Sequence, residues 1–275
     1  MNKFKQIFNN QKLNLIGMVH VPALPGSPRH TLAIEEICDI ACTEAKKLCS
    51  AGIDGIIVEN MHDVPYIRGA DVGPHTIACM TKICTEVRKV VPSGYPCGLQ
   101  ILASANMEAM AVAHATGFQF IRAEGFVFGH IADEGWTEAC AGPLLRYKKN
   151  IGADRVSIIV DIKKKHGSHA VTSDVSLVDT AEAAQFFQAD GVVVTGTATG
   201  RPSDPQEVRD IQNACRDLPV IVGSGVSPKN LKLFRNAHAL IIGSYLKKDG
   251  IWMNELDVKR ITEMVDLVKT IRSEE

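Results

Sequence analysis

The sequence predicts an α/β fold, a single-domain (β/α)8 barrel of the TIM type. Eight short apolar runs, each as long as a buried strand, alternate with amphipathic helical stretches along 275 residues. No linker-like segment divides the chain, so the predicted barrel domain covers residues 13–275 behind a basic N-terminal extension, residues 1–12. A doubly wound open sheet is the alternative, because alternation alone does not decide whether the sheet closes.

The predicted strands share a local pattern. A small residue or glycine ends a helix, one or two polar residues follow, and then comes a hydrophobic run that ends in polar groups. Five segments show this pattern clearly and three further apolar runs fill the gaps. The predicted strands lie within residues 13–20, 51–60, 96–102, 116–125, 151–161, 188–196, 218–223 and 236–244.

Helices are predicted between these runs, over residues 31–50, 176–187, 205–215 and 255–272. The first carries its apolar side chains on one stripe, as a helix packed on a barrel requires. In the third, Asp204 stands before Pro205 and three residues before Glu207, which approximates a capping box with proline at the first helical position. Ser227 and Pro228 are also expected to open a helix after the strand at 218–223.

The composition indicates a soluble protein that binds a small molecule. Hydrophobic residues make up 45% of the chain and the formal net charge is −1. No apolar run reaches the roughly 18–20 residues of a membrane span, and no basic, aromatic-interleaved patch predicts a nucleic-acid partner. The eight cysteines form no CxxC pair, so we expect free thiols, no metal site and no cofactor.

The N-terminal region is basic and lacks acidic residues. It contains Lys3, Lys5, Lys12 and Arg29, and the first carboxylate is Glu35. Mitochondrial targeting segments share this bias. We therefore expect an intracellular, soluble protein, with a mitochondrial location suggested and a cytoplasmic one as the alternative.

The longest segment without a predicted element is 125–142. Long loops in compact domains are often functional. We expect this segment to be a lid over the barrel mouth. A contact in a homo-oligomer is the alternative.

Active sites of such barrels lie at the carboxyl ends of the strands. On strand 151–161, alternation turns Val156, Ile158 and Val160 toward the helices and Asp161 and Lys163 together into the barrel. Buried charges are costly unless paired or used, so these two residues are predicted to be catalytic, with Glu59 or Glu124 as general acid or base. A structural ion-pair layer is the alternative. The predicted substrate-binding residues at neighbouring strand ends are His20, Asn60, Gln100, Arg122, Thr195 and Arg201.

Glycine turns follow the last two predicted strands. Phosphate sites in barrels are often built from these two loops, where bare amide N–H groups face the ligand. The predicted phosphate-binding residues are Gly196, Gly223, Ser224, Gly225, Gly243 and Ser244. The alternative is that tight turns simply require glycine. Because two glycine turns stand at the paired positions, we expect the ligand to be a small phosphorylated molecule.

Four motifs resemble the BtpA family. They are GMVHVPALPGSP at 17–28, ENMHDVPY at 59–66, DIKKKH at 161–166 and VVVTGTATGRP at 192–202, and the resemblance spans nearly the whole chain. It implies a phosphate-binding (β/α)8 barrel and, through the family's name, a link to photosystem I accumulation. It assigns no reaction and no catalytic residues.

Three functions follow from these patterns. The first is an enzyme that performs isomerase or aldolase/lyase-type chemistry on a phosphorylated metabolite, with Lys163 stabilising negative charge or forming an imine and Asp161 orienting it. The second is a non-catalytic biogenesis or assembly factor built on a barrel scaffold. The third is metal-assisted hydrolysis by Glu59, His62, Asp63 or Asp161 with His166, although their spacing matches no metal motif.

Overall fold

The computed structural model describes residues 2–9, 11–196 and 202–274, and its main sheet is a closed barrel of eight parallel strands. Going around the barrel, the strand order is β1-β11-β10-β9-β7-β4-β3-β2. The predicted closed barrel is therefore confirmed, and every barrel strand falls at a predicted position. The strands are β1 (Asn14–His20), β2 (Gly55–Glu59), β3 (Cys97–Gln100), β4 (Phe120–Ala123), β7 (Ser157–Ile162), β9 (Gly191–Val194), β10 (Val220–Val222) and β11 (Ala239–Ile242).

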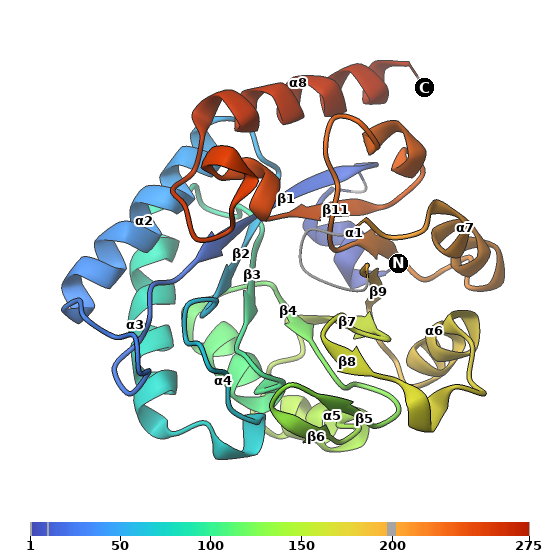
Figure 1. The fold of residues 1–275 in the computed structure, drawn as a ribbon, viewed down its shortest axis with the longest axis horizontal. Coiled ribbons are helices and arrows are strands. Elements are labelled where there is room, and N and C mark those ends of the chain that lie inside the picture. The colour runs from blue at the N-terminus through green and yellow to red at the C-terminus, as the bar shows by residue number, and fades with distance from the viewer. Residues whose placement is uncertain (1, 10, 197–201, 275) are drawn as a thin grey trace.

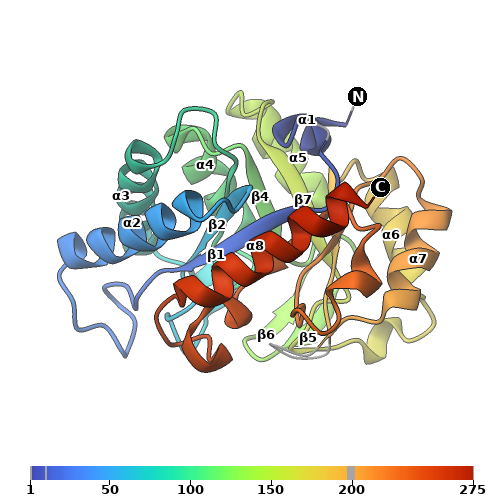
Figure 2. The same ribbon diagram turned by 90° about the horizontal axis from the view of Figure 1, so that it is seen from above.

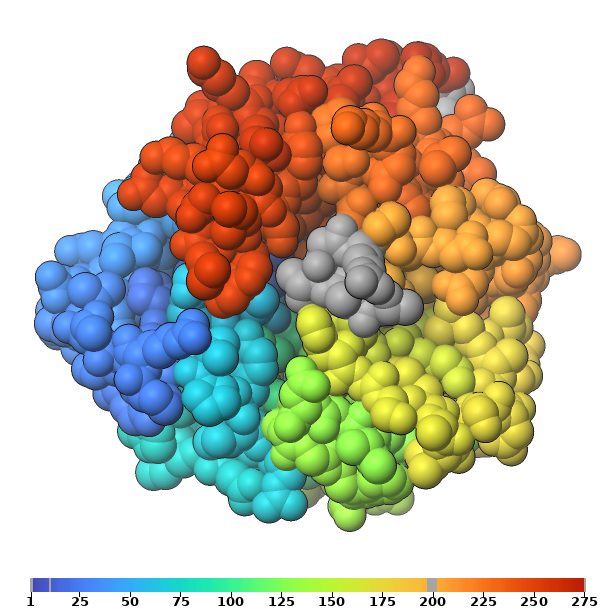
Figure 3. Space-filling model, in the orientation of Figure 1, coloured from blue at the N-terminus to red at the C-terminus, as the bar shows by residue number. Residues whose placement is uncertain are grey.

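Helices surround the barrel (Figure 1). They are α2 (Ile34–Ser50), α3 (Pro74–Val90), α4 (Asn106–Thr116), α5 (Ala141–Asn150), α6 (Leu177–Phe186), α7 (Pro205–Ala214) and α8 (Val258–Ser273). In Figure 3 the segments succeed one another around one face from blue to red, as consecutive β/α units do. None of the helices in the described ranges is long and apolar enough to cross a bilayer.

The helix expected at Ser227 and Pro228 is wrong. Only a 3-10 helix, η3 (Leu231–Phe234), lies between β10 and β11. Side-chain bonds compete with helix formation here: Asn230 accepts the Ser227 N–H at 2.8 Å and donates to the Gly225 carbonyl at 2.9 Å. Any anion site after β10 must therefore use turn amides, because no α-helix N-terminus is present there.

The N-terminal residues form the floor of the barrel. Helix α1 (Lys3–Ile7) turns Phe4 and Phe8 inward, and both side chains are buried. The ring centroids of Phe4 and Phe120 are 5.9 Å apart in an edge-to-face arrangement. In Figure 2, α1 lies at the end of the barrel opposite to β5 and β6. The strand amino ends are thus closed, and the carboxyl ends are left for a site.

The segment 125–142 carries a hairpin and is not an irregular loop. Its strands β5 (His130–Ala132) and β6 (Gly135–Thr137) pair antiparallel, and β5 also pairs with β8 (Gly167–Ser168). The hairpin turn brings Asp133 and Glu134 to the edge of the main cavity. That position agrees with a cover over the barrel mouth, whereas the contact between copies of the chain stays a prediction.

Candidate active site at the carboxyl ends of the strands

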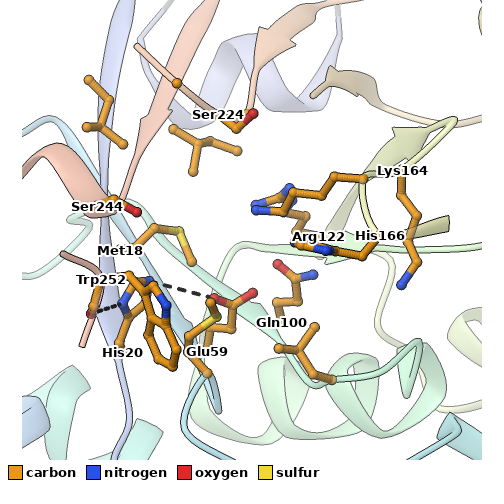
Figure 4. Close-up of a pocket in the computed structure, with 18 of the residues that line it drawn as sticks. Met18, His20, Glu59, Gln100, Arg122, Lys164, His166, Ser224, Ser244 and Trp252 are labelled. Atoms are coloured by element: carbon orange, nitrogen blue, oxygen red, sulfur yellow. Dashed lines mark hydrogen bonds and ion pairs between the residues drawn. The ribbon is translucent and has the colours of Figure 1, made fainter. Parts of the chain in front are cut away.

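A cavity of about 530 Å³ opens at the carboxyl ends of the barrel strands. Its described lining comes from the ends of β1, β2, β3, β4, β7, β10 and β11 and from the segments that follow them, and Figure 4 shows part of it. The sequence predicted ten of the residues that line it: His20, Glu59, Gln100, Arg122, Glu124, Gly223, Ser224, Gly225, Gly243 and Ser244. Five of the other predicted residues are described but do not line it, for reasons given below, and the sixth, Arg201, lies outside the described residues.

Arg122 projects into the cavity from β4 and is held from behind by Asp161 of β7. Nε donates to Oδ1 and Nη2 to Oδ2 of Asp161, both at 2.9 Å, and both side chains are buried. This bidentate geometry fixes the plane of the guanidinium. A Cβ placed on Gly223 would lie 3.4 Å from Nη2, so the guanidinium stands beside the β10 turn. Asp161 therefore orients Arg122 and does not itself line the main cavity.

The two glycine turns present backbone amides to the cavity. The N–H groups of Gly225, Val226, Ser244 and Tyr245 have no hydrogen-bond acceptor among the described residues. Gly225 has φ +68°, which favours glycine. The β10 turn stands beside Arg122, and the β11 turn lines the same cavity next to His20 and Met18. Free turn amides near an arginine form a site suited to an anion.

Packing explains the glycine at 223. Its own N–H donates to the Val194 carbonyl, and a Cβ there would lie 2.5 Å from Val193 Cγ1. For Gly223 the glycine is therefore explained by close packing and not by a ligand. The amides without an acceptor belong to Gly225 and Val226, further along the turn.

The end of β9 supports this turn without lining the cavity. The Gly196 N–H, predicted to bind phosphate, donates to Ser224 Oγ at 2.9 Å. Thr195 Oγ1 accepts the Lys165 backbone N–H at 3.2 Å. Both groups are thus used to tie neighbouring loops together, and Arg201 lies outside the described residues.

Asn60 braces two loops. Its Oδ1 accepts the Leu102 N–H at 2.7 Å and its Nδ2 donates to Asp63 Oδ2 at 2.9 Å. Asp63 in turn accepts the Leu24 N–H at 2.7 Å. The amide expected to bind substrate is therefore saturated by protein groups, and it holds the loops after β1, β2 and β3 in register.

Glu59 is the buried carboxyl group of the cavity. Burial raises its pKa to about 7, an effect that the positive charges of Arg122 and Lys165 only partly offset. His20 Nε2 lies 3.8 Å from Glu59 Oε2, and its Nδ1 lies 3.3 Å from the Trp252 carbonyl oxygen. Burial, and secondarily the charge of Lys247, holds the pKa of His20 well below its usual range. A neutral imidazole thus stands beside a carboxyl group that can exchange a proton near neutral pH.

The prediction that Lys163 reaches this cavity is wrong. Strand β7 ends at Ile162, and Lys163 has φ +44°, so the alternation of faces stops there. Its Nζ donates to the Thr172 carbonyl at 3.0 Å beside a separate small cavity of about 20 Å³. Lys165, two residues later, lines the main cavity instead.

Lys165 is a lysine of the cavity that was not predicted from the sequence. Burial lowers its pKa, and the charge of Arg122 acts in the same direction. Glu59, Asp161 and Glu124 are close enough to act on the pKa in the opposite direction. The run of three lysines after β7 was visible in the sequence, but only the turn at Lys163 decides which of them enters the barrel.

A second buried ion-pair group lies under the β5–β6 hairpin. Lys164 Nζ is 3.3 Å from Glu124 Oε2 and 3.1 Å from Glu134 Oε1. Although burial opposes its charge, these two carboxylates raise the pKa of Lys164. Glu124, a predicted acid or base, is thus engaged with Lys164, and the network ties the hairpin to β4.

Metal-assisted hydrolysis finds no support in the described part of the chain. Its His, Cys, Asp and Glu side chains form no group of three or more that could hold a metal ion. Asp63 and Asp161 are committed to Leu24 and Arg122, respectively. The third function therefore lacks a ligand set in these ranges.

Comparison with known sequences identifies relatives that span the whole barrel. A family model described as the BtpA family matches residues 11–270. An uncharacterized mitochondrial protein of Caenorhabditis elegans is 44% identical and covers 97% of both chains. An uncharacterized protein of Pyrococcus horikoshii is 35% identical over 96% of this chain and 98% of its own. The photosystem I biogenesis protein BtpA of Synechocystis is 32% identical over 92% and 86%, respectively.

Solved structures share the fold at low sequence identity. The orotidine monophosphate (OMP) decarboxylase of Leishmania donovani has a TM-score of 0.58 at 16% identity, with 99% of each chain covered. The phosphoribosyl anthranilate isomerase of Thermus thermophilus has a TM-score of 0.58 at 9% identity, covering 94% of this chain and 100% of the other. At these identities the likeness establishes the barrel fold alone.

Proposed function

The chain belongs to the BtpA family, and we propose that its barrel is an enzyme that acts on a small phosphorylated metabolite. The chemistry is of the isomerase or lyase type, in which a proton is moved or a carbon bond is cleaved. One observation carries the proposal: a single cavity joins open turn amides and the Arg122 guanidinium to a buried carboxyl group whose pKa is about 7.

Each group has a role in this scheme. The amides of Gly225 and Ser244, with the Arg122 guanidinium, bind the phosphate. Glu59 transfers the proton, because a pKa near the working pH suits both directions of transfer. Lys165 stabilises negative charge that develops on the substrate, or its neutral amine condenses with the substrate carbonyl group to an imine with release of water. Asp161 keeps Arg122 in position. The two solved structures with a similar fold are named for phosphorylated substrates, which is consistent with this substrate class.

Replacing Ser244 with aspartate should weaken binding of phosphorylated compounds at least about tenfold. Ser244 is half-buried beside the open amides, and a carboxylate there repels the phosphate. Ser244→Asn is the matched control, with nearly the same shape and no charge, and should bind as the wild type does. Binding is measured by calorimetry with those members of a panel of phosphorylated sugars and nucleotides that raise the melting temperature. If none of them raises it, the proposed function is wrong.

Lys165 should show an unusually low pKa in the folded protein. We expect its reductive methylation by formaldehyde and borohydride, followed by peptide mass spectrometry, to have a pH midpoint below the ordinary lysine value of about 10.4. Lys163→Met is the control. Because Lys163 Nζ donates to the Thr172 carbonyl, away from Lys165, this variant should leave the pH midpoint of Lys165 methylation unchanged. A Lys165 midpoint at the ordinary value would contradict the assignment.

A biogenesis or assembly role is the second candidate, favoured by the name of the Synechocystis relative. It uses the barrel as a scaffold and the 125–142 segment as the contact. In that case, no phosphorylated compound would change the melting temperature, and substitutions at Trp136, which is about half exposed, would release a co-purifying partner.

The mitochondrion is the proposed location. The basic, acid-free start of the chain and the name of the Caenorhabditis elegans relative support it. Fractionation of cells that carry a C-terminally tagged chain tests this, since a tag found only in the cytosol would overturn it.

A further inference from the structure

The side chain of Gln100 faces the cavity with an unused acceptor. Gln100 is 2% exposed, and the buried Oε1 of its side chain has no hydrogen-bond partner in the described part of the chain. Buried amide oxygens are nearly always bonded, because leaving one unpaired is unfavourable. A carboxamide offers an acceptor and a donor side by side. Gln100 is therefore suited to a ligand group that presents an N–H or O–H toward it.

Gln100 lies across the barrel from the phosphate turns. In the closed strand order, three strands separate β3 from β10 on either side, so the two stand opposite each other. In the view of Figure 4, Ser224 and Gln100 lie on either side of the Arg122 guanidinium. A ligand with its phosphate on the β10 and β11 turns must span the cavity to reach Gln100.

Part of the cavity wall is apolar and offers a sugar few polar partners. The loops after β2 and β3 and the segment after β11 contribute Met61, Val64, Tyr66, Leu102 and Trp252 to the lining. A simple sugar phosphate carries a hydroxyl group on nearly every carbon, and each would lose hydrogen bonds against such a wall. A flat ring loses none and gains buried apolar area.

The polar groups on this side form a single row. In the strand register His20 pairs with Glu59, and Glu59 with Gln100, so the three side chains stand at one level of β1, β2 and β3. The row offers a carboxyl group and a carboxamide to the edge of a ligand ring, while the aromatic and aliphatic side chains cover the faces of that ring.

Resting on the proposed function, we infer that the substrate has two ends: a phosphate and a planar ring with a hydrogen-bond donor. The phosphate lies on the β10 and β11 turns beside Arg122. The ring lies against Tyr66 and Trp252 and directs its donor to Gln100. The substrate class is thus a nucleotide-like or other ring-bearing phosphorylated compound, not a plain sugar phosphate.

Calorimetry on the full chain with five probes tests this inference. The probes are inorganic phosphate, ribose 5-phosphate, and the 5′-monophosphates of uridine, cytidine and adenosine. At least one nucleotide should bind ten times more tightly than ribose 5-phosphate. Gln100→Leu should reduce that advantage at least tenfold while leaving ribose 5-phosphate binding unchanged. Gln185→Leu, on the exposed face of α6, is the matched control and should change neither.

The melting temperature of Gln100→Leu separates binding from folding. Because the change removes a buried acceptor without a partner, the variant should melt no lower than the wild type. The inferred ring site is wrong, and the phosphate site stands, if ribose 5-phosphate binds as tightly as every nucleotide. The same holds if Gln100→Leu weakens binding of ribose 5-phosphate and of the nucleotides equally. If no probe binds, both this inference and the proposed function fall.

Discussion

Replacing Arg122 with methionine is expected to lower the free energy of unfolding by about 3–5 kcal/mol, because it strands the buried carboxylate of Asp161. The Asp161 side chain is 1% exposed and gives both oxygens to Arg122. The same change removes the cation beside the glycine turns, so binding of phosphorylated probes should also be lost. Urea unfolding, followed by the fluorescence of Trp136 and Trp252, measures the first effect and calorimetry the second.

A double variant separates the two effects. Arg122→Met combined with Asp161→Leu removes both charges, so most of the lost stability should return while phosphate binding stays absent. Arg68→Met is the matched control, since Arg68 pairs with Asp71 on the surface and its loss should leave the urea midpoint unchanged. A double variant that binds phosphate like the wild type would show that Arg122 only stabilises the fold.

The sequence was sufficient to predict the barrel, because the relevant signals are local and repeated. Five of the eight strands are marked by a helix end followed by an apolar run, and the other three are apolar runs at the expected spacing. Alternation then places Asp161 inside, where the structure has it buried against Arg122. The glycine turns after the last two strands were also visible, since their positions follow from the strand count.

The sequence failed where the chain leaves the regular strand. Side chains alternate between the two faces of β7 only as far as Ile162. Lys163 has a positive φ, and after this turn Lys165 lines the cavity while Lys163 does not. The expected helix at Ser227 fails for a related reason, since the Asn230 side chain accepts the Ser227 N–H and donates to the Gly225 carbonyl. The position of Lys163 and the absence of the helix both depend on the backbone conformation of one or two residues, which the apolar pattern does not predict.

Long-range partners were equally invisible. Asp161 was expected to orient Lys163, yet the guanidinium that it holds comes from β4, 39 residues earlier in the chain. The floor built by Phe4 and Phe8 likewise joins the N-terminus to β4. Such contacts follow from barrel closure, which composition and periodicity favour but do not specify residue by residue.

Replacing Glu59 with glutamine should stabilise the protein in a way that depends on pH. Burial raises the Glu59 pKa from 4.5 to about 7, so between these values the folded chain keeps a proton that the unfolded chain releases. The stability of the wild type therefore falls as the pH rises through this window, by roughly 3 kcal/mol in total. Glu59→Gln does not titrate, so it should equal the wild type near pH 4.5 and exceed it by that amount at pH 8.

The neighbouring imidazole provides the control for this assignment. Burial lowers the pKa of His20 well below its usual value and so favours the neutral imidazole, which does not set the pKa of Glu59 through a positive charge. The same Glu59→Gln comparison made in a His20→Gln background should therefore show the same window. Urea midpoints from pH 4.5 to 8 measure all four chains. If the stability difference between Glu59→Gln and the wild type does not change across this range, Glu59 ionises normally. The proposal that Glu59 transfers the proton would then be wrong.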